Sequence, residues 1–66
     1  MPVIQIQTAK MTKEDKAELI RAITKAASEV TKLPEQAFVI TIQELERDNF
    51  GVGGVQLSEM VHGRNS

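Results

Sequence analysis

Residues 1–7 read MPVIQIQ, and this stretch decides how the whole chain is interpreted. From Val3 to Thr8, β-branched and amide side chains nearly alternate, so isoleucine falls on one face and glutamine on the other. This alternation is typical of a strand with one face in contact with a core. Pro2 stands directly before it. Proline cannot donate to a sheet ladder and is tolerated at the first residue of a strand, so we expect a strand over residues 3–8.

Pro2 has a chemical use as well as a structural one. Initiator methionine is commonly removed when the next residue is proline, and the shortened chain then begins with a secondary amine that can carry a proton. A base that works near neutral pH needs its protonated form disfavoured, by burial or by nearby cations. The residues alone favour the strand-start use of Pro2 over the catalytic one.

A helix is predicted after the first strand. Thr12 followed by Asp15 resembles a capping box, which places the helix start at Lys13. Pro34 disfavours helical geometry in the residue before it, so the helix should end near Lys32. Apolar residues recur at steps of three and four and form the expected buried stripe: Leu19, Ile20, Ile23, Ala26, Ala27 and Val30. Charged residues fall largely on the other side: Lys16, Glu18, Arg21, Lys25 and Glu29.

The rest of the chain predicts a second strand and a hairpin. Residues 37–45, AFVITIQEL, alternate like a strand, and strand, helix and strand together predict a βαβ unit with parallel strands and a right-handed crossover. In residues 50–57, FGVGGVQL, the glycines predict a tight hairpin. A phosphate-binding loop is the alternative, but no lysine followed by Ser or Thr comes after it. The predicted fold class is α+β, in a single domain over residues 1–66.

Composition predicts self-association and argues against several classes of protein. The chain has 66 residues, no cysteine and one histidine, so we expect neither disulfides nor a zinc site to stabilise it. Because so short a chain is marginally stable alone, we expect it to be stabilised by oligomer formation. A net charge of −1 and two aromatic residues argue against nucleic-acid or anionic-membrane binding. No apolar run reaches the ~20 residues of a membrane span, and the N-terminus lacks a signal-peptide layout, so we expect a cytoplasmic protein.

The remaining titratable groups give little indication of a site. His62 is interpreted as a solvated histidine near the C-terminus, without the partners of a catalytic triad. Glu44, Glu46 and Asp48 cluster after the second strand, but their spacing around Arg47 is typical of a solvated connection. The sequence therefore predicts no metal site.

Several motifs taken together resemble a known family. Pro2 heads a short strand, LIRAIT lies in the helix, the turn ends in Pro34, and NFGVGG follows the second strand. This arrangement resembles the 4-oxalocrotonate tautomerase family of small βαβ proteins over nearly the whole chain. Its most specific part is the pairing of a proline at position 2 with FGVGG at this distance. The resemblance implies a homohexamer, a trimer of dimers, in which two βαβ units share a four-stranded sheet and the hairpin reaches a neighbouring subunit.

The resemblance also implies a reaction. Members of this family ketonise 2-hydroxy-dienoates such as 2-hydroxymuconate without a cofactor, and their N-terminal proline moves the proton. By resemblance, Pro2 would be the general base after removal of Met1. Phe50 would be the apolar wall that keeps the amine neutral. An equally open reading of Phe50 is that its ring anchors the hairpin in the core.

This chain departs from the family pattern at two positions. The usual site has one arginine in the loop after the first strand and another in the middle of the second strand. Here the mid-strand position is Val39, and the loop reads AKMTK. Lys10 or Lys13 could replace the loop cation, and Arg47 is a further candidate. Val39 and Lys10 thus complete the expected substrate-binding set, and a lysine in place of arginine would alter substrate choice.

Two alternatives stay open beside the tautomerase. A protonated Pro2 would act as an acid, in dehalogenation or hydration of a small unsaturated acid. A non-catalytic oligomeric module of the same fold is favoured by the missing arginines. If Met1 is retained, the nitrogen of Pro2 is an amide nitrogen and cannot act as a base.

Overall fold

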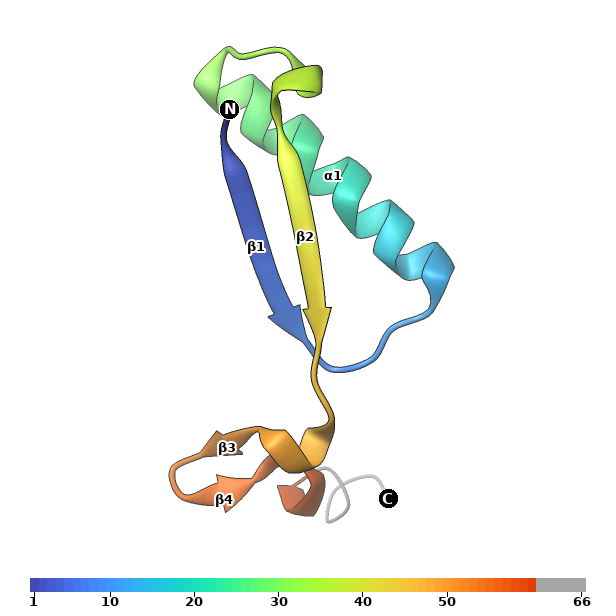
Figure 1. Ribbon diagram of the computed structural model, residues 1–66, viewed down its shortest axis with the longest axis vertical. Coiled ribbons are helices and arrows are strands. Elements are labelled where there is room, and N and C mark those ends of the chain that lie inside the picture. Colours follow the sequence, from blue (N-terminus) through green and yellow to red (C-terminus); the bar gives the residue numbers. More distant parts are fainter. Residues whose placement is uncertain (61–66) are drawn as a thin grey trace.

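The computed structural model describes residues 1–60 and has the predicted α+β fold (Figure 1). Strand β1 (Val3–Thr8) leads into helix α1 (Lys13–Thr31), and strand β2 (Val39–Glu44) returns beside β1. The two strands are parallel and in register from Val3↔Val39 to Thr8↔Glu44. The predicted βαβ unit is therefore confirmed. His62 lies outside the described residues.

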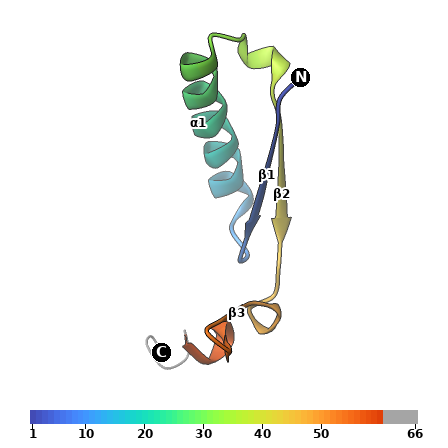
Figure 2. The same ribbon diagram turned by 90° about the vertical axis from the view of Figure 1, so that its left-hand side faces the viewer.

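The sheet has one covered and one open face. Helix α1 lies along one side of the strand pair, and no part of the described chain covers the other side (Figure 2). Ile4, Ile6, Ile40 and Ile42 are half-buried, as expected for side chains that point toward the helix. The exposed residues of the two strands alternate with them and form the open face: Val3, Gln5, Gln7, Val39, Thr41 and Gln43. On this face Gln7 Nε2 donates to Gln43 Oε1 at 3.2 Å.

Both ends of α1 are capped by side chains or backbone groups near the predicted limits. The Thr12 hydroxyl accepts a hydrogen bond from the backbone N–H of Asp15 at 3.0 Å, which confirms the predicted N-cap. At the other end Lys32 adopts the left-handed conformation (φ 65°), and its N–H donates to the Ser28 carbonyl at 2.9 Å. A short 3₁₀ helix, η1 (Glu35–Ala37), then leads into β2.

The buried stripe of α1 is narrower than the sequence pattern predicts. Leu19, Ile23 and Ala27 are half-buried, but Ile20 is 39% exposed and Val30 is 81% exposed. Lys16, expected on the charged side, is instead half-buried and reaches Glu44 at the end of β2. The reason is geometric. Two strands about 4.8 Å apart form too narrow a surface to cover the whole apolar stripe of a helix, so its margins stay exposed.

The predicted hairpin is confirmed and stands apart from the βαβ unit. A second 3₁₀ helix, η2 (Arg47–Asn49), precedes strands β3 (Gly51–Val52) and β4 (Val55–Gln56), which pair antiparallel. Gly53 and Gly54 between them have φ of 62° and 87°, as a type I′ turn requires. The hairpin lies beyond the end of the sheet, where the strands point (Figure 1).

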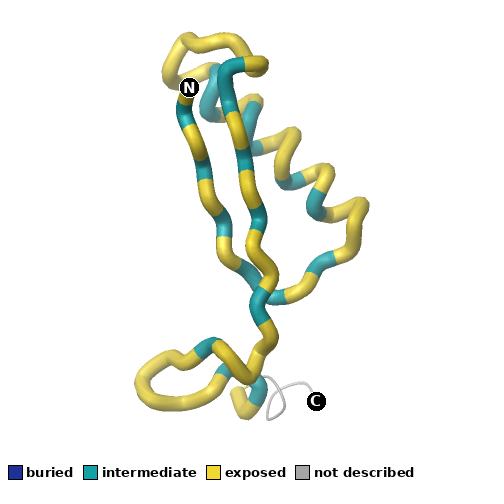
Figure 3. Tube along the Cα trace, in the orientation of Figure 1, coloured by how far each residue is buried: buried dark blue, intermediate teal, exposed yellow. Residues whose placement is uncertain are grey.

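No residue that the structure describes is fully buried in the single chain. Within residues 1–60 every residue is half-buried or exposed, and the chain measures 43 × 24 × 16 Å (Figure 3). Large apolar side chains of the hairpin are open, with Val52 61% and Val55 46% exposed. No helix of the described part of the chain is both long and apolar enough to cross a membrane. The apolar surface left open agrees with the expectation that the protein needs further chains to complete its core.

Candidate active site

Pro2 is held at the entrance of β1 by its carbonyl group. The backbone N–H of Val39 donates to the Pro2 carbonyl oxygen at 3.0 Å, which extends the contact between the strands by one residue beyond β1. Pro2 itself is half-buried, whereas Met1 before it is 85% exposed. The anchor uses the carbonyl only. The nitrogen of Pro2 is therefore not needed to hold the strand in place.

The structure brings Val39 next to Pro2. Val39 is the first residue of β2, and its register partner on β1 is Val3. Both valines belong to the open face of the sheet, where Val3 is 56% and Val39 is 37% exposed. On the open face of the sheet, the side chains next to Pro2 are thus apolar.

The other two candidate residues lie at the opposite end of the strands. Lys10 follows the end of β1, and Phe50 stands at the base of the hairpin (Figure 1). Six strand residues at about 3.3 Å each span about 20 Å, so a single chain does not bring Pro2 together with Lys10 or Phe50. Phe50 is half-buried, and its carbonyl accepts from the Leu57 N–H at 2.9 Å across the base of the hairpin.

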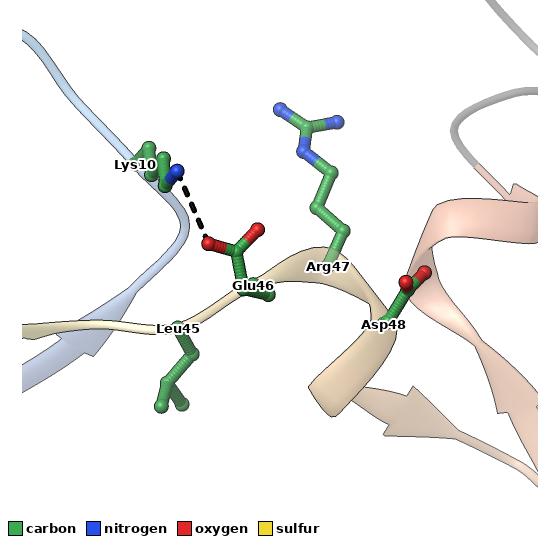
Figure 4. Close-up of a pocket in the computed structure, with 5 residues that line it drawn as sticks. All are labelled: Lys10, Leu45, Glu46, Arg47 and Asp48. Atoms are coloured by element: carbon green, nitrogen blue, oxygen red, sulfur yellow. Dashed lines mark ion pairs between the residues drawn. The ribbon is translucent and has the colours of Figure 1, made fainter.

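A hollow of about 170 Å³ lies between the loop after β1 and η2. Its lining residues are Lys10, Leu45, Glu46, Arg47 and Asp48 (Figure 4). The Lys10 ammonium lies 3.1 Å from a Glu46 carboxylate oxygen, and the two side chains are 69% and 64% exposed. Exposed pairs of this kind are worth only about 0.2–1 kcal/mol, so the ammonium can exchange Glu46 for another anion. Arg47 makes no ion pair within residues 1–60.

Glu44, the last residue of β2, contacts both the loop after β1 and helix α1. Its carboxylate accepts from the backbone N–H of Met11 at 3.0 Å and lies 3.0 Å from the ammonium of Lys16. The hydrogen bond from Met11, followed by the one from Lys16, lowers the pKa of Glu44 below its ordinary value. Glu44 is exposed, as the sequence interpretation of a solvated connection predicts. It is a structural residue that fixes the loop carrying Lys10, whereas Lys13, the other loop candidate, is exposed at the start of α1.

Sequence reasoning missed η2, which forms one side of the hollow. Residues 46–49 carry three charged side chains and no apolar periodicity, so they gave only the signal of a solvated connection. Within residues 1–60 no three His, Cys, Asp or Glu side chains gather closely enough to hold a metal ion.

A sequence model of the family described as "Tautomerase enzyme" matches residues 2–60. This chain belongs to the tautomerase family. The match begins at Pro2 and includes both strands, the helix and the hairpin, so it spans every element described above.

Similar proteins and solved structures support this family membership. A probable tautomerase of Bacillus cereus is 35% identical over 60 residues, which cover 89% of this chain and 98% of the relative. A 2-hydroxymuconate tautomerase of Bacillus subtilis is 33% identical over 61 residues, covering 91% and 98%. Among solved structures, a heterohexamer 4-oxalocrotonate tautomerase of Chloroflexus aurantiacus superposes with a TM-score of 0.86 at 31% identity, covering 91% of this chain and 98% of that one. The resemblance seen in the sequence is confirmed, and with it the assignment to a family of isomerases.

Proposed function

We propose that this chain, once Met1 has been removed, ketonises a 2-hydroxy-dienoate or a related enol acid without a cofactor, with Pro2 as the general base. The observation that carries the proposal is the position of Pro2. It is the first residue of the family match, and its carbonyl is fixed to Val39 while its nitrogen takes no part in that hydrogen bond. The 2-hydroxymuconate tautomerase among the relatives supports this substrate class.

The proton would move in two steps that leave the enzyme unchanged. The nitrogen lone pair of Pro2 takes the proton of the enol hydroxyl, and the O–H electrons form the carbonyl bond. The carbon–carbon double bonds shift along the conjugated chain, and the far carbon takes a proton from the protonated proline. The products are the ketone and a neutral Pro2, so no oxidant or further reactant is needed.

Removal of Met1 fits the local structure. Met1 is 85% exposed, so its peptide bond to Pro2 lies in reach of a processing enzyme. Cleavage would leave the bond between the Pro2 carbonyl and Val39 in place. It would convert the nitrogen from an amide into a secondary amine, the form that can accept a proton.

The site would be completed by neighbouring copies of the chain. Pro2 lies beside the start of β2 and Phe50 follows the end of β2, so the ring that shields the amine would come from a hairpin of another subunit. The open valines of the hairpin and the absence of buried residues within 1–60 support such an assembly. The relative from Chloroflexus aurantiacus is a heterohexamer, which supports six chains. We propose a homohexamer, a trimer of dimers, in which Lys10 supplies the cation for a substrate carboxylate.

The decisive experiment is the Pro2→Ala variant, assayed for ketonisation of 2-hydroxymuconate. General-base catalysis contributes about 10²- to 10⁴-fold, so we expect kcat to fall by that factor while sedimentation shows the same oligomer. Lys25→Ala, an exposed change on α1, is the control and should keep wild-type activity. Full activity of the Pro2→Ala variant would show that the base is another group.

A non-catalytic oligomeric module is the second candidate. It is favoured by Val39 and the AKMTK loop, which together lack the two arginines of the usual site. The intact mass of protein from its native host separates the two candidates. Loss of the Met1 mass supports the enzyme, and a retained Met1 supports the module because the amide nitrogen of Pro2 could not act as a base.

A further inference from the structure

The sheet surface beside Pro2 carries no charge. The open face of β1 and β2 is made of two valines, one threonine and three glutamines: Val3, Gln5, Gln7, Val39, Thr41 and Gln43. The two valines are register partners at the end that holds Pro2, and the glutamine pair Gln7–Gln43 lies toward the other end. A molecule bound at Pro2 therefore meets apolar surface first.

Three described cations lie at the other end of the strands, whereas Lys32, which caps α1 at the end near Pro2, belongs to the helix side of the sheet. Lys10 pairs with Glu46, Lys16 pairs with Glu44, and Arg47 follows Glu46 in η2. The length of β1, about 20 Å, separates them from Pro2 of the same chain. Because the Debye length is about 10 Å at 0.1 M salt, these charges do little for an anion at Pro2 of their own chain.

In the proposed assembly a neighbour's hairpin end meets Pro2, and it brings one such group of cations. Lys10 and Arg47 line the same hollow of about 170 Å³, so they would serve the same end of a substrate. The other end of the substrate would lie against the valines beside Pro2. A carboxylate placed there would lose its hydration without gaining a partner, whereas an aryl or alkyl group would gain from leaving water.

We propose, on the basis of the proposed function, that the substrate is an enol acid with a single carboxylate and an apolar substituent, and that the Val3–Val39 pair binds this substituent. The pair selects against dicarboxylates. Its selectivity comes from the unpaired charge that a second carboxylate would leave on an apolar surface.

The test compares two substrates on Met1-free protein. Phenylenolpyruvate has one carboxylate and a ring, and 2-hydroxymuconate has two carboxylates. We expect kcat/KM for phenylenolpyruvate to exceed that for 2-hydroxymuconate by about tenfold or more. Val39→Arg should raise kcat/KM for 2-hydroxymuconate by about ten- to a hundredfold through a charge-assisted hydrogen bond, without raising it for phenylenolpyruvate.

The matched control is Ala22→Arg. It adds the same charge at an exposed position of α1, on the side of the sheet opposite the open face, and should leave the ratio of the two kcat/KM values unchanged. Sedimentation checks that each variant keeps the wild-type oligomer. A wild-type preference for 2-hydroxymuconate, or a ratio that moves equally in both variants, would overturn the inference.

A binding measurement keeps the inference testable if Val39→Arg fails to assemble or if turnover is absent. Cinnamate and muconate are unreactive acids with one and two carboxylates, and their dissociation constants for Pro2→Ala can be measured by NMR titration. We expect cinnamate to bind more tightly, and the opposite order would overturn the inference. If the wild type turned over neither enol, the proposed function would be refuted but this inference would not. The dissociation constants of cinnamate and muconate test the inference independently of turnover.

Discussion

The two ends of the β1–β2 pair are built from different interactions. At the N-terminal end, one backbone hydrogen bond joins Pro2 to Val39, and the exposed side chains beside it are valines. At the C-terminal end, Glu44 binds the loop and the helix, and Lys10 pairs with Glu46. Charge at one end stabilises the fold, while the other end leaves a nitrogen and an apolar surface uncommitted. Under the proposed function, chemistry would belong to the Pro2 end, and anchoring together with carboxylate binding would belong to the other.

The largest expected effect comes from blocking the Pro2 end. A chain that keeps an uncleaved residue before Pro2 has an amide nitrogen there, so kcat for ketonisation should fall by about 10²- to 10⁴-fold. The fold should be unaffected, because the Pro2 carbonyl still accepts from Val39. Intact mass and enzyme assay on the same sample measure both quantities. An active sample in which every chain carries the extra residue would remove the contrast between the ends.

A smaller effect is expected from the charged end. Lys10→Ala should raise KM for phenylenolpyruvate by about ten- to a hundredfold with little change in kcat, because a charged hydrogen bond to the carboxylate is lost. The exposed pair with Glu46 contributes little stability, so the melting temperature should hardly move. If Arg47→Ala raises KM and Lys10→Ala does not, the cation is Arg47. If neither variant raises KM, the charged end has no part in binding.

The smallest effect concerns stability and pH. The folded state lowers the pKa of Glu44 from its ordinary 4.5, chiefly through the hydrogen bond from Met11. The carboxylate therefore stabilises the fold fully above that value, and the contribution is lost as pH falls through the lowered pKa. Thermal unfolding of the wild type and of Glu44→Gln should differ near neutral pH and converge in acid. A constant difference across this range would show that Glu44 stabilises by shape and not by charge.

Much of the local structure was predictable because its signals are local. Strand β1 has its predicted limits because alternation in VIQIQT is unbroken, and α1 starts where Thr12 and Asp15 place the cap. The hairpin turn was predictable from the adjacent Gly53 and Gly54, which both adopt positive φ. Strand β2 is shorter than the predicted 37–45, since the backbone N–H groups of Ala37 and Phe38 complete the turn of η1 and do not join the sheet.

The features that could not be predicted from the sequence depend on contacts between residues distant in the chain. The inward turn of Lys16 depends on Glu44, 28 positions away, and the exposure of Val30 depends on the width of a two-stranded sheet. For the site, the motif identified Pro2 and Phe50 but not their separation. That they stand at opposite ends of one chain follows only from the parallel strands and the position of the hairpin. The role of each in catalysis stays a prediction.

The central claim is that the free nitrogen of Pro2 acts as a base, and the dependence of kcat/KM on pH tests it most directly. The measurement uses Met1-free protein with phenylenolpyruvate, corrected for the rate in buffer alone. A base requires the neutral amine, so kcat/KM should rise with pH through a single pKa and then level off, and this step should be absent in Pro2→Ala. A profile that falls with rising pH through that pKa would make Pro2 an acid and contradict the account.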